Sequence, residues 1–282
     1  GMCGLRLEVD SQIILAQSTV VNNIFKSVNK AGIKVLGVVF EPIAVSGVVL
    51  KEEEIQRGIA LVDAGSDSIN IYIYKGGSLK SISTLPLGGD IITNDIAVCL
   101  KIPILEAEKL KIKYGSVAEN SFDDNFKVEV NANYNNKVKV DCNILNQIIE
   151  ARVEELFSLI NRELSKSEYY DELSGIVIVG GGMALINGIE EFGKDVLGKL
   201  VRVGIPKYIG AASPLYVTAV GIVKDVSNSI KLKNIPGVNP SKNNNLPDYK
   251  NIIEDEDEKE MESENKTNGF ISRIKDFFTD FF

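Results

Sequence analysis

The chain has 282 residues, of which 44% are hydrophobic and 25% are charged, a composition typical of globular proteins with a full-sized core. It contains no histidine, which excludes the commonest general base, the Ser-His-Asp triads and most catalytic zinc sites. Most of the net charge of −8 lies in one acidic stretch near the C-terminus. No basic stripe is available to follow a nucleic-acid backbone, so we expect no nucleic-acid partner.

The N-terminal part predicts strands and helices in alternation. Apolar and β-branched residues predict strands over 5–16 and 35–42, and helical spacing predicts helices over 19–32 and 43–57. A hairpin follows, with IALVDAG (59–65) before two alternating runs in 69–89 that a KGG turn joins.

The rest of the chain alternates longer helices with short strands. Helical patterns cover 90–99, 103–113, 143–166, 185–197 and 213–226. Weak strand signals lie within 116–141, and short buried strands are predicted at 175–182 and 201–206. Strands that alternate with helices predict an α/β fold with a mixed sheet.

The last part of the chain contains two contrasting segments. Residues 251–268 carry eight acidic residues against two lysines, so we expect 231–268 to be a disordered acidic linker with a reach of about 35 Å. Residues 269–282 predict an amphipathic helix, too short for the roughly 20 residues that a bilayer crossing needs. Its apolar side chains are Phe270, Ile271, Ile274, Phe277, Phe278, Phe281 and Phe282.

Two environments would suit that terminal helix: its own domain, or a membrane surface or partner groove outside the chain. The acidic linker in front of it and its high phenylalanine content favour an external target. We therefore expect it to lie in a membrane interface.

Three short motifs have residue types that suit nucleotide binding. Asp63 ends a hydrophobic strand before a glycine-containing turn, where backbone N–H groups can approach phosphates and a carboxylate can hold Mg²⁺ through water. Three glycines in IVGGGMALINGI (178–189) join a buried strand to a helix. Glu108 and Lys111 share a helical face and could bond the hydroxyls of a ribose. Taken singly, the first motif is better explained as an ordinary hairpin and the third as a solvated helix face, and tight strand-to-helix packing explains the glycine turn about as well as a ligand does.

The order of these motifs carries more information than any one of them. LGGDIITNDIA (87–97) lies between the first and third, GMCGLRLEV opens the chain, and IIEARVEELFSLINREL (148–164) and SPLYVTAVGIV (213–223) complete the series. The combination resembles the FtsA family of bacterial cell-division proteins, over nearly the whole chain. The resemblance implies an α/β fold that is the second half of an actin-like (ribonuclease H-like) ATPase, with a mixed sheet and flanking helices, plus a remnant of the FtsA-specific small subdomain.

The resemblance also implies a domain organisation. Residues 1–42 would be the remnant of the small subdomain, and 43–58 a helix that returns from the first large subdomain. Residues 59–230 would form the second lobe, with its core in 59–95 and 175–230 and a smaller subdomain in 96–174. The linker (231–268) and the membrane-targeting helix (269–282) would follow.

Candidate binding residues follow from the same resemblance. The second phosphate hairpin would comprise Asp63, Gly65, Ser66 and Ser68, with Asp63 facing Mg²⁺ through water. Glu108 and Lys111 would hold the ribose of ATP, and the adenine would be flanked by Gly180, Gly181, Gly182 and Met183. Arg152 and Glu155, on the long helix, are candidates for the partner-peptide surface. No residue is assigned a catalytic role.

The family's first phosphate hairpin has no counterpart in this sequence, so we expect weak nucleotide binding and little or no ATP hydrolysis by this chain alone. The resemblance implies a scaffold at the cytoplasmic face of the plasma membrane, at the division site. It would tether FtsZ by binding the C-terminal peptide of FtsZ, and it would bind lipid through its own terminal helix. It would also self-associate and recruit other division proteins. An actin-like pilus-assembly adaptor and a sugar- or acid-kinase relative are the alternatives.

Overall fold

The computed structural model describes residues 6, 8, 11, 13–35, 37–119, 121, 123, 126–132 and 137–233, the last five of them by backbone alone. The chain divides into two compact units, Gly1–Val38 with Ile230–Phe282, and Val39–Ser229. In the first unit, α1 (Ser18–Lys30) confirms the helix predicted over 19–32 and ends before Gly32, whose φ is +77°. Residues 13–16, within the predicted strand over 5–16, form no strand.

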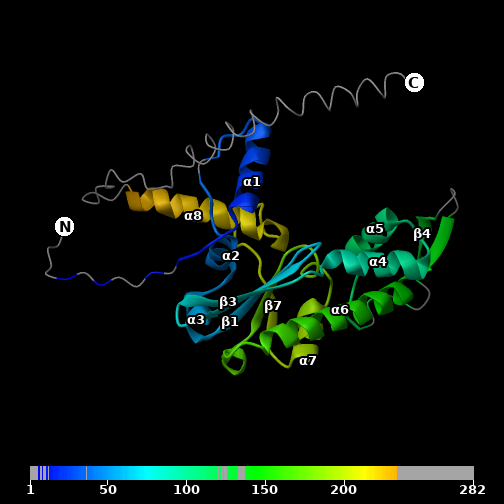
Figure 1. Ribbon diagram of the computed structural model, residues 1–282. Coiled ribbons are helices and arrows are strands. Elements are labelled where there is room, and N and C mark those ends of the chain that lie inside the picture. The colour runs from blue at the N-terminus through cyan, green and yellow to red at the C-terminus, as the bar shows by residue number, and fades with distance from the viewer. Residues whose placement is uncertain are drawn as a thin grey trace, which may run out of the picture. The chain divides into compact units, whose positions relative to one another are not determined.

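The second unit is built on a mixed five-stranded sheet in the order β3-β2-β1-β6-β7 (Figure 1). Its strands are β1 (Ile59–Ala64), β2 (Ile69–Lys75), β3 (Ser78–Leu85), β6 (Ile176–Val179) and β7 (Val201–Val203). The first three form an antiparallel meander, whereas β6 lies parallel to both β1 and β7. Gly76 and Gly77 have positive φ, which gives the tight turn between β2 and β3 that the KGG motif predicts. The α/β class with a mixed sheet is confirmed.

Helices cover both faces of this sheet. On one face, α2 (Glu41–Val49) and the start of α8 (Val217–Lys233) pack with the strands, and Val45, Val49, Leu61, Val177 and Val217 form a buried cluster there. On the other face, α6 (Cys142–Leu164) and α7 (Ile189–Leu197) join a larger core around Val62, Ile71 and Ile178 (Figure 1). Strand β1 is buried on both sides, because it lies at the centre of the sheet between two cores.

A smaller helical part extends from the sheet. It consists of α4 (Gly89–Leu100), α5 (Ile104–Tyr114), the hairpin of β4 (Lys127–Asn131) with β5 (Lys137–Asp141), and the first half of α6. The side chain of Asp141 caps α6 by accepting a hydrogen bond of 2.9 Å from the N–H of Asn143. The hairpin accounts for the weak strand signals in 116–141. Two short 3-10 helices lie at Tyr170–Glu172 and Pro214–Tyr216.

Two element predictions near the start of this unit are wrong. The strand predicted over 35–42 is absent from residues 37–40, and helix α2 already begins at Glu41, with Pro42 in its first turn. The helix predicted over 43–57 is interrupted, because Leu50 is extended and a new helix, α3 (Glu52–Arg57), starts after it. Glu54 stabilises that second start by accepting a 2.7 Å hydrogen bond from the N–H of Lys51.

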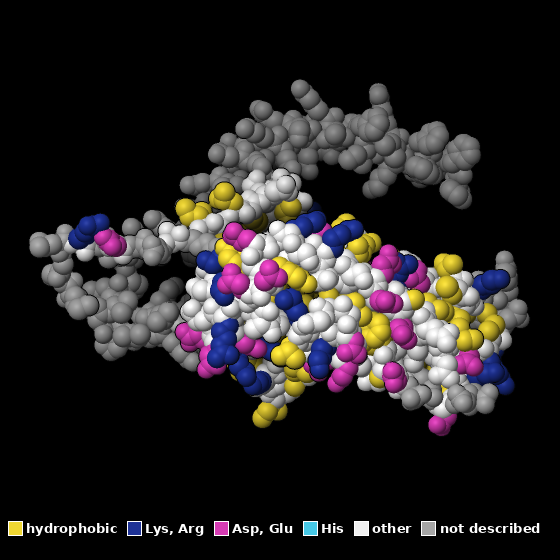
Figure 2. Space-filling view, turned by 90° about the horizontal axis from the view of Figure 1, so that it is seen from below, with side chains coloured by type: hydrophobic (Ala, Val, Ile, Leu, Met, Phe, Trp, Pro, Cys, Tyr) yellow, Lys and Arg dark blue, Asp and Glu magenta, His cyan; other side chains and the backbone are white. Residues whose placement is uncertain are grey.

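No described helix combines the length and the apolar composition that crossing a membrane requires. On the face shown in Figure 2, acidic and basic side chains are interspersed with apolar ones instead of gathering by sign.

The pair of Arg202 and Glu54 fixes the start of α3 against strand β7. Nη2 of Arg202 donates to Oε1 and Oε2 of Glu54, at 2.9 and 2.7 Å, and to the carbonyl oxygen of Val49 at 2.8 Å. The Glu54 side chain is only 23% exposed. Because the pair is bidentate and charge-assisted, it contributes more than an ordinary surface ion pair.

We predict that Glu54→Gln lowers the free energy of unfolding by about 1 to 2 kcal/mol, because it weakens the bidentate pair and the Lys51 cap together. Urea denaturation measures this change. Glu52→Gln, at an exposed position of the same helix, is the control and should cost far less. Equal losses in the two variants would show that the Arg202 pair contributes nothing.

Candidate functional site

Three loops of the second unit meet at the residues that the sequence predicts to bind the phosphates and the base of a nucleotide. The N–H of Gly89 donates to the carbonyl oxygen of Gly65 at 2.9 Å, and the N–H of Gly182 donates to that of Ala64 at 2.7 Å. Within the hairpin, the N–H of Gly65 donates to the carbonyl oxygen of Ser68 at 2.9 Å. The hairpin after β1, the first turn of α4 and the glycine turn after β6 therefore form one hydrogen-bonded cluster.

Glycine is required in this cluster because the backbones approach one another closely. A Cβ atom on Gly182 would lie 2.1 Å from the carbonyl oxygen of Gly65, and a Cβ on Gly89 would lie 2.6 Å from Cα of Gly182. Neither distance is possible for a real side chain, and in both cases the obstructing atom is backbone. Loop packing thus accounts for these glycines without a ligand. The N–H groups of Gly65, Gly89 and Gly182 are used in these loop-to-loop hydrogen bonds and are not available to a phosphate. A phosphate would instead contact the exposed tip of the hairpin around Ser66.

Asp63 lies at the end of β1 and is partly buried. Burial, and then the nearby carboxylate of Glu41, raise the pKa of Asp63 to about 6. Glu41, at the start of α2, accepts a 3.2 Å hydrogen bond from Oγ1 of Thr218. Burial also raises the pKa of Tyr72, and the Glu41 and Asp63 carboxylates raise it further. Two carboxylates and a phenol thus share one region of the sheet surface beneath α2.

This carboxylate pair fits a hard divalent cation. A cation beside the two groups would relieve their mutual repulsion, which adds to the effect of burial on the pKa of Asp63, and carboxylate oxygens are the ligands that Mg²⁺ prefers. The described residues hold no group of three or more potential metal ligands, so water or a phosphate would have to complete the coordination. Glu41 was not predicted from the sequence. Its signal is the same as that of Asp63, since both carboxylates follow a run of hydrophobic residues.

The predicted ribose pair, Glu108 and Lys111, is assembled on α5. Nζ of Lys111 lies 2.7 Å from Oε2 of Glu108, 2.7 Å from Oγ1 of Thr93 and 3.0 Å from the carbonyl oxygen of Gly89. Thr93 also donates a short hydrogen bond to Glu108. The Lys111 side chain is 7% exposed, whereas that of Glu108 is 39% exposed, so the carboxylate is the member open to a ligand. Thr93 was not predicted, because no local spacing links it to α5.

The structure therefore brings most of the predicted nucleotide residues together. The hairpin residues and the glycines of the turn after β6 lie around the start of α4. The Glu108–Lys111 pair joins them because Lys111 donates to the carbonyl oxygen of Gly89. Met183 is completely buried, so its side chain belongs to the core and only its backbone could border a base. The predicted membrane residues, Phe270 to Phe282, lie outside the described residues.

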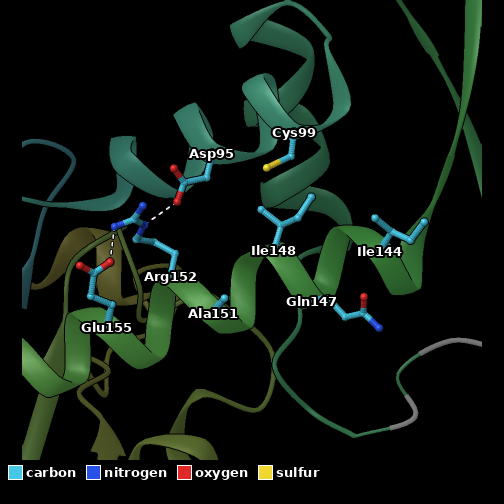
Figure 3. Close-up of a pocket in the computed structure, with 8 residues that line it drawn as sticks. All are labelled: Asp95, Cys99, Ile144, Gln147, Ile148, Ala151, Arg152 and Glu155. Atoms are coloured by element: carbon cyan, nitrogen blue, oxygen red, sulfur yellow. Dashed lines mark hydrogen bonds and ion pairs between the residues drawn. The ribbon is translucent and has the colours of Figure 1, made fainter.

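Arg152 and Glu155, the predicted partner residues, line a groove between α4 and α6 that is separate from the loop cluster (Figure 3). Nε of Arg152 donates to Asp95 on α4 and Nη1 donates to Glu155 on α6. The groove has a volume of about 510 Å³. Its other lining residues are Cys99, Ile144, Gln147, Ile148 and Ala151. Asp95 and Cys99 were missed, since only the tertiary fold brings α4 beside α6.

The sequence model of the family described as "Cell division protein FtsA" matches residues 60–221, more than half of the chain. The chain belongs to the FtsA family. The matched range contains the loop cluster, the groove and all of the sheet except Ile59, the first residue of β1. The family inferred from the order of motifs is thereby confirmed.

Individual FtsA proteins support this assignment. The FtsA of Bacillus subtilis is 35% identical over 234 residues, which cover 82% of this chain and 53% of that protein. The FtsA of Enterococcus faecalis is 29% identical over 300 residues, which cover all of this chain and 67% of the relative. The FtsA of Escherichia coli is 29% identical, over 79% and 56% of the two chains. The chain spans about half the length of most of these relatives.

Solved structures agree on the actin-like fold. MreB5 of Spiroplasma citri bound to ADP has a TM-score of 0.63 at 17% identity, covering 79% of this chain and 68% of that one. A PilM–PilN type IV pilus biogenesis complex has a TM-score of 0.54 at 20% identity, covering 73% and 57%. At these identities the likeness concerns the fold alone.

We predict that Asp63→Asn stabilises the protein, and more so at high pH. Folding raises the pKa of Asp63 from 3.8 to about 6, so ionisation costs stability that appears above pH 3.8 and is complete only above about pH 6. An uncharged Asn avoids this cost. The gain in Tm, measured by circular dichroism in EDTA, should be a few degrees at about pH 8 and smaller at about pH 5.

Asp67→Asn is the matched control, because Asp67 is an exposed residue of the same turn. Its Tm should follow that of the unsubstituted protein at both pH values. A Tm gain for Asp63→Asn that is independent of pH would contradict the assigned origin of the shift.

Proposed function

We propose that this chain acts as an FtsA-type scaffold that tethers FtsZ filaments to the cytoplasmic face of the plasma membrane at the division site. The observation that carries the proposal is membership of the FtsA family, combined with a groove between α4 and α6 that contains both partner candidates. The folded unit would hold the C-terminal peptide of FtsZ, and the terminal helix would hold the lipid surface. Self-association and recruitment of other division proteins belong to the same proposal.

The groove has the properties expected of a peptide-binding surface. It combines partly exposed apolar side chains with charged groups at one end, and α6 supplies most of its length (Figure 3). Ile144, at the end away from Arg152, is 51% exposed. An extended segment of a few residues could place an apolar side chain there and polar groups beside Glu155.

Nucleotide would bind at the loop cluster. Asp63 and Glu41 would hold Mg²⁺, which would neutralise phosphate charge, and the hairpin tip from Ser66 to Ser68 would face the phosphates. Glu108, oriented by Lys111 and Thr93, would accept hydrogen bonds from ribose hydroxyls. The backbone of the turn from Gly180 to Met183 would border the adenine. We assign nucleotide a structural role in this scaffold and assign no hydrolytic residue.

The membrane part of the proposal rests on the sequence of residues 269–282. Its basic residues, Arg273 and Lys275, are balanced by Asp276 and Asp280, and the preceding acidic linker is repelled by anionic lipid. Burial of phenylalanine must therefore supply the affinity for a bilayer. Binding should depend weakly on salt.

We predict that the double variant Phe277→Glu with Phe278→Glu no longer floats with lipid vesicles in a density gradient, because two charges replace the centre of the apolar stripe. Ser272→Glu with Thr279→Glu, on the polar side, is the matched control and should retain flotation with uncharged vesicles. Flotation of the phenylalanine variant at the unsubstituted level would rule out this helix as the anchor.

We predict that Ile144→Glu weakens binding of a synthetic FtsZ C-terminal peptide at least tenfold, measured by fluorescence anisotropy, because it places a charge at the apolar end of the groove. Ile112→Glu introduces the same charge at a position on α5 that is 71% exposed and does not line the groove. It should leave the affinity unchanged. An unchanged affinity for Ile144→Glu would place the peptide elsewhere.

A further inference from the structure

The segment that follows α5 is hydrogen-bonded to the turn that precedes α7. The N–H of Val117 donates to the carbonyl oxygen of Asn187 at 2.8 Å, and the N–H of Asn187 donates to the carbonyl oxygen of Gly115 at 3.4 Å. These two bonds form a parallel bridge between Ser116 and Asn187, which are 71 positions apart in the sequence. The Ser116–Asn187 bridge therefore joins the smaller helical part to the turn that leaves β6.

Side chains reinforce the bridge. Nδ2 of Asn187 donates to Oγ of Ser116 at 3.2 Å, and the N–H of Ala118 donates to the same oxygen at 3.1 Å. Oγ of Ser121 lies 2.6 Å from it. The N–H of Ser116 donates to Oδ1 of Asn146 on α6 at 3.1 Å. Because Ser116 is only 2% exposed and its polar atoms are all bonded, this arrangement fixes one geometry.

The backbones also meet closely one residue beyond the bridge. Gly188 has a φ of +80°, and a Cβ atom at this position would lie 2.6 Å from the backbone nitrogen of Ala118. A side chain there would force the two segments apart. The contact therefore has little freedom to slide.

The bridge is a second point of attachment for α5. The first is Lys111, which bonds the carbonyl oxygen of Gly89 and Oγ1 of Thr93 near the start of α4. The second follows directly on Gly115, the residue at which α5 ends. Two attachments along one helix fix its rotation as well as its position. The direction of the half-exposed Glu108 carboxylate depends on both.

On its other side, the bridge holds the glycine turn. Asn187 follows Met183 by four residues, and the N–H of Ile186 donates to the carbonyl oxygen of Met183 at 3.0 Å. The segment between the base-bordering glycines and α7 is thus tied to the helix that carries the ribose pair. The hairpin after β1 is attached separately, through the bond from Gly89 to Gly65. Loss of the bridge should leave that hairpin in place.

We propose that Ser116 and Asn187 are positioning residues for the nucleoside part of a nucleotide: they hold Glu108 at the distance from the glycine turn that a ribose joined to its base requires. The inference rests on the proposed function, because it adds residues to the same candidate nucleotide site. Neither residue needs to touch the ligand. Their effect should be confined to the ribose and base and should leave the phosphates unaffected.

A comparison of ligands tests this role. ADP, 2′,3′-dideoxy-ADP and pyrophosphate are titrated with Mg²⁺ into the full chain, and NMR measures the dissociation constants, including millimolar ones. We expect ADP to bind about tenfold more tightly than the dideoxy analogue, because only ADP can donate ribose hydroxyls to Glu108. Asn187→Ala should reduce this ratio to about threefold or less, with no change in the affinity for pyrophosphate.

Three further variants separate positioning from a general effect on the fold. Glu108→Gln should reduce the ratio as Asn187→Ala does, and the double variant should reduce it no further, because the two residues act on one interaction. Ser116→Ala should match Asn187→Ala. Asn228→Ala, at an exposed position of α8, is the matched control and should keep the full ratio. General destabilisation would weaken both nucleotides equally and leave the ratio unchanged.

The outcomes distinguish the inference from the site on which it rests. A ratio that falls in Glu108→Gln but persists in Asn187→Ala would overturn the positioning role and leave the ribose assignment intact. A ratio that persists in both variants would overturn the ribose assignment and the positioning role together. Absence of ADP binding to the unsubstituted chain would overturn the nucleotide site itself and the positioning role with it.

Discussion

The close approach of three backbones at the start of α4 is the constraint on which the rest of this structure depends. Gly65, Gly89 and Gly182 allow the hairpin after β1, the first turn of α4 and the turn after β6 to bond to one another directly. That contact sets where α4 begins and the direction in which it leaves the sheet. The same helix then carries Asp95 and Cys99 into the groove with α6. The candidate nucleotide site and the candidate partner groove are thus two ends of one short helix.

Buried charge is treated differently at these two ends. At the sheet, burial and then the nearby carboxylate of Glu41 raise the pKa of Asp63 to about 6. In the groove, Arg152 is paired with Asp95 and with Glu155, and these interactions raise the pKa of Arg152.

Much of the fold could be predicted from the sequence, because its signals are local. The KGG turn, the alternating strands and the long helix at 142–164 all follow from spacing along the chain. The errors arose where local pattern is overridden: the apolar run before Glu41 forms no described strand, and a predicted single helix breaks at Leu50 because Glu54 caps a new start. For the site, the motifs located the loops and the Glu108–Lys111 pair, and the order of motifs identified the family. Glu41, Thr93 and Asp95 were missed, since each acquires its role from a residue at least fifteen positions away.

The proposed role requires one chain to hold lipid and FtsZ simultaneously, and a bridging experiment measures this directly. FtsZ filaments are mixed with lipid vesicles and floated in a density gradient, with and without this chain. The account predicts that FtsZ floats only when the chain is present, and that an excess of free FtsZ C-terminal peptide returns the filaments to the bottom while the chain itself stays with the vesicles. Flotation of the chain with FtsZ left behind at every concentration would contradict it.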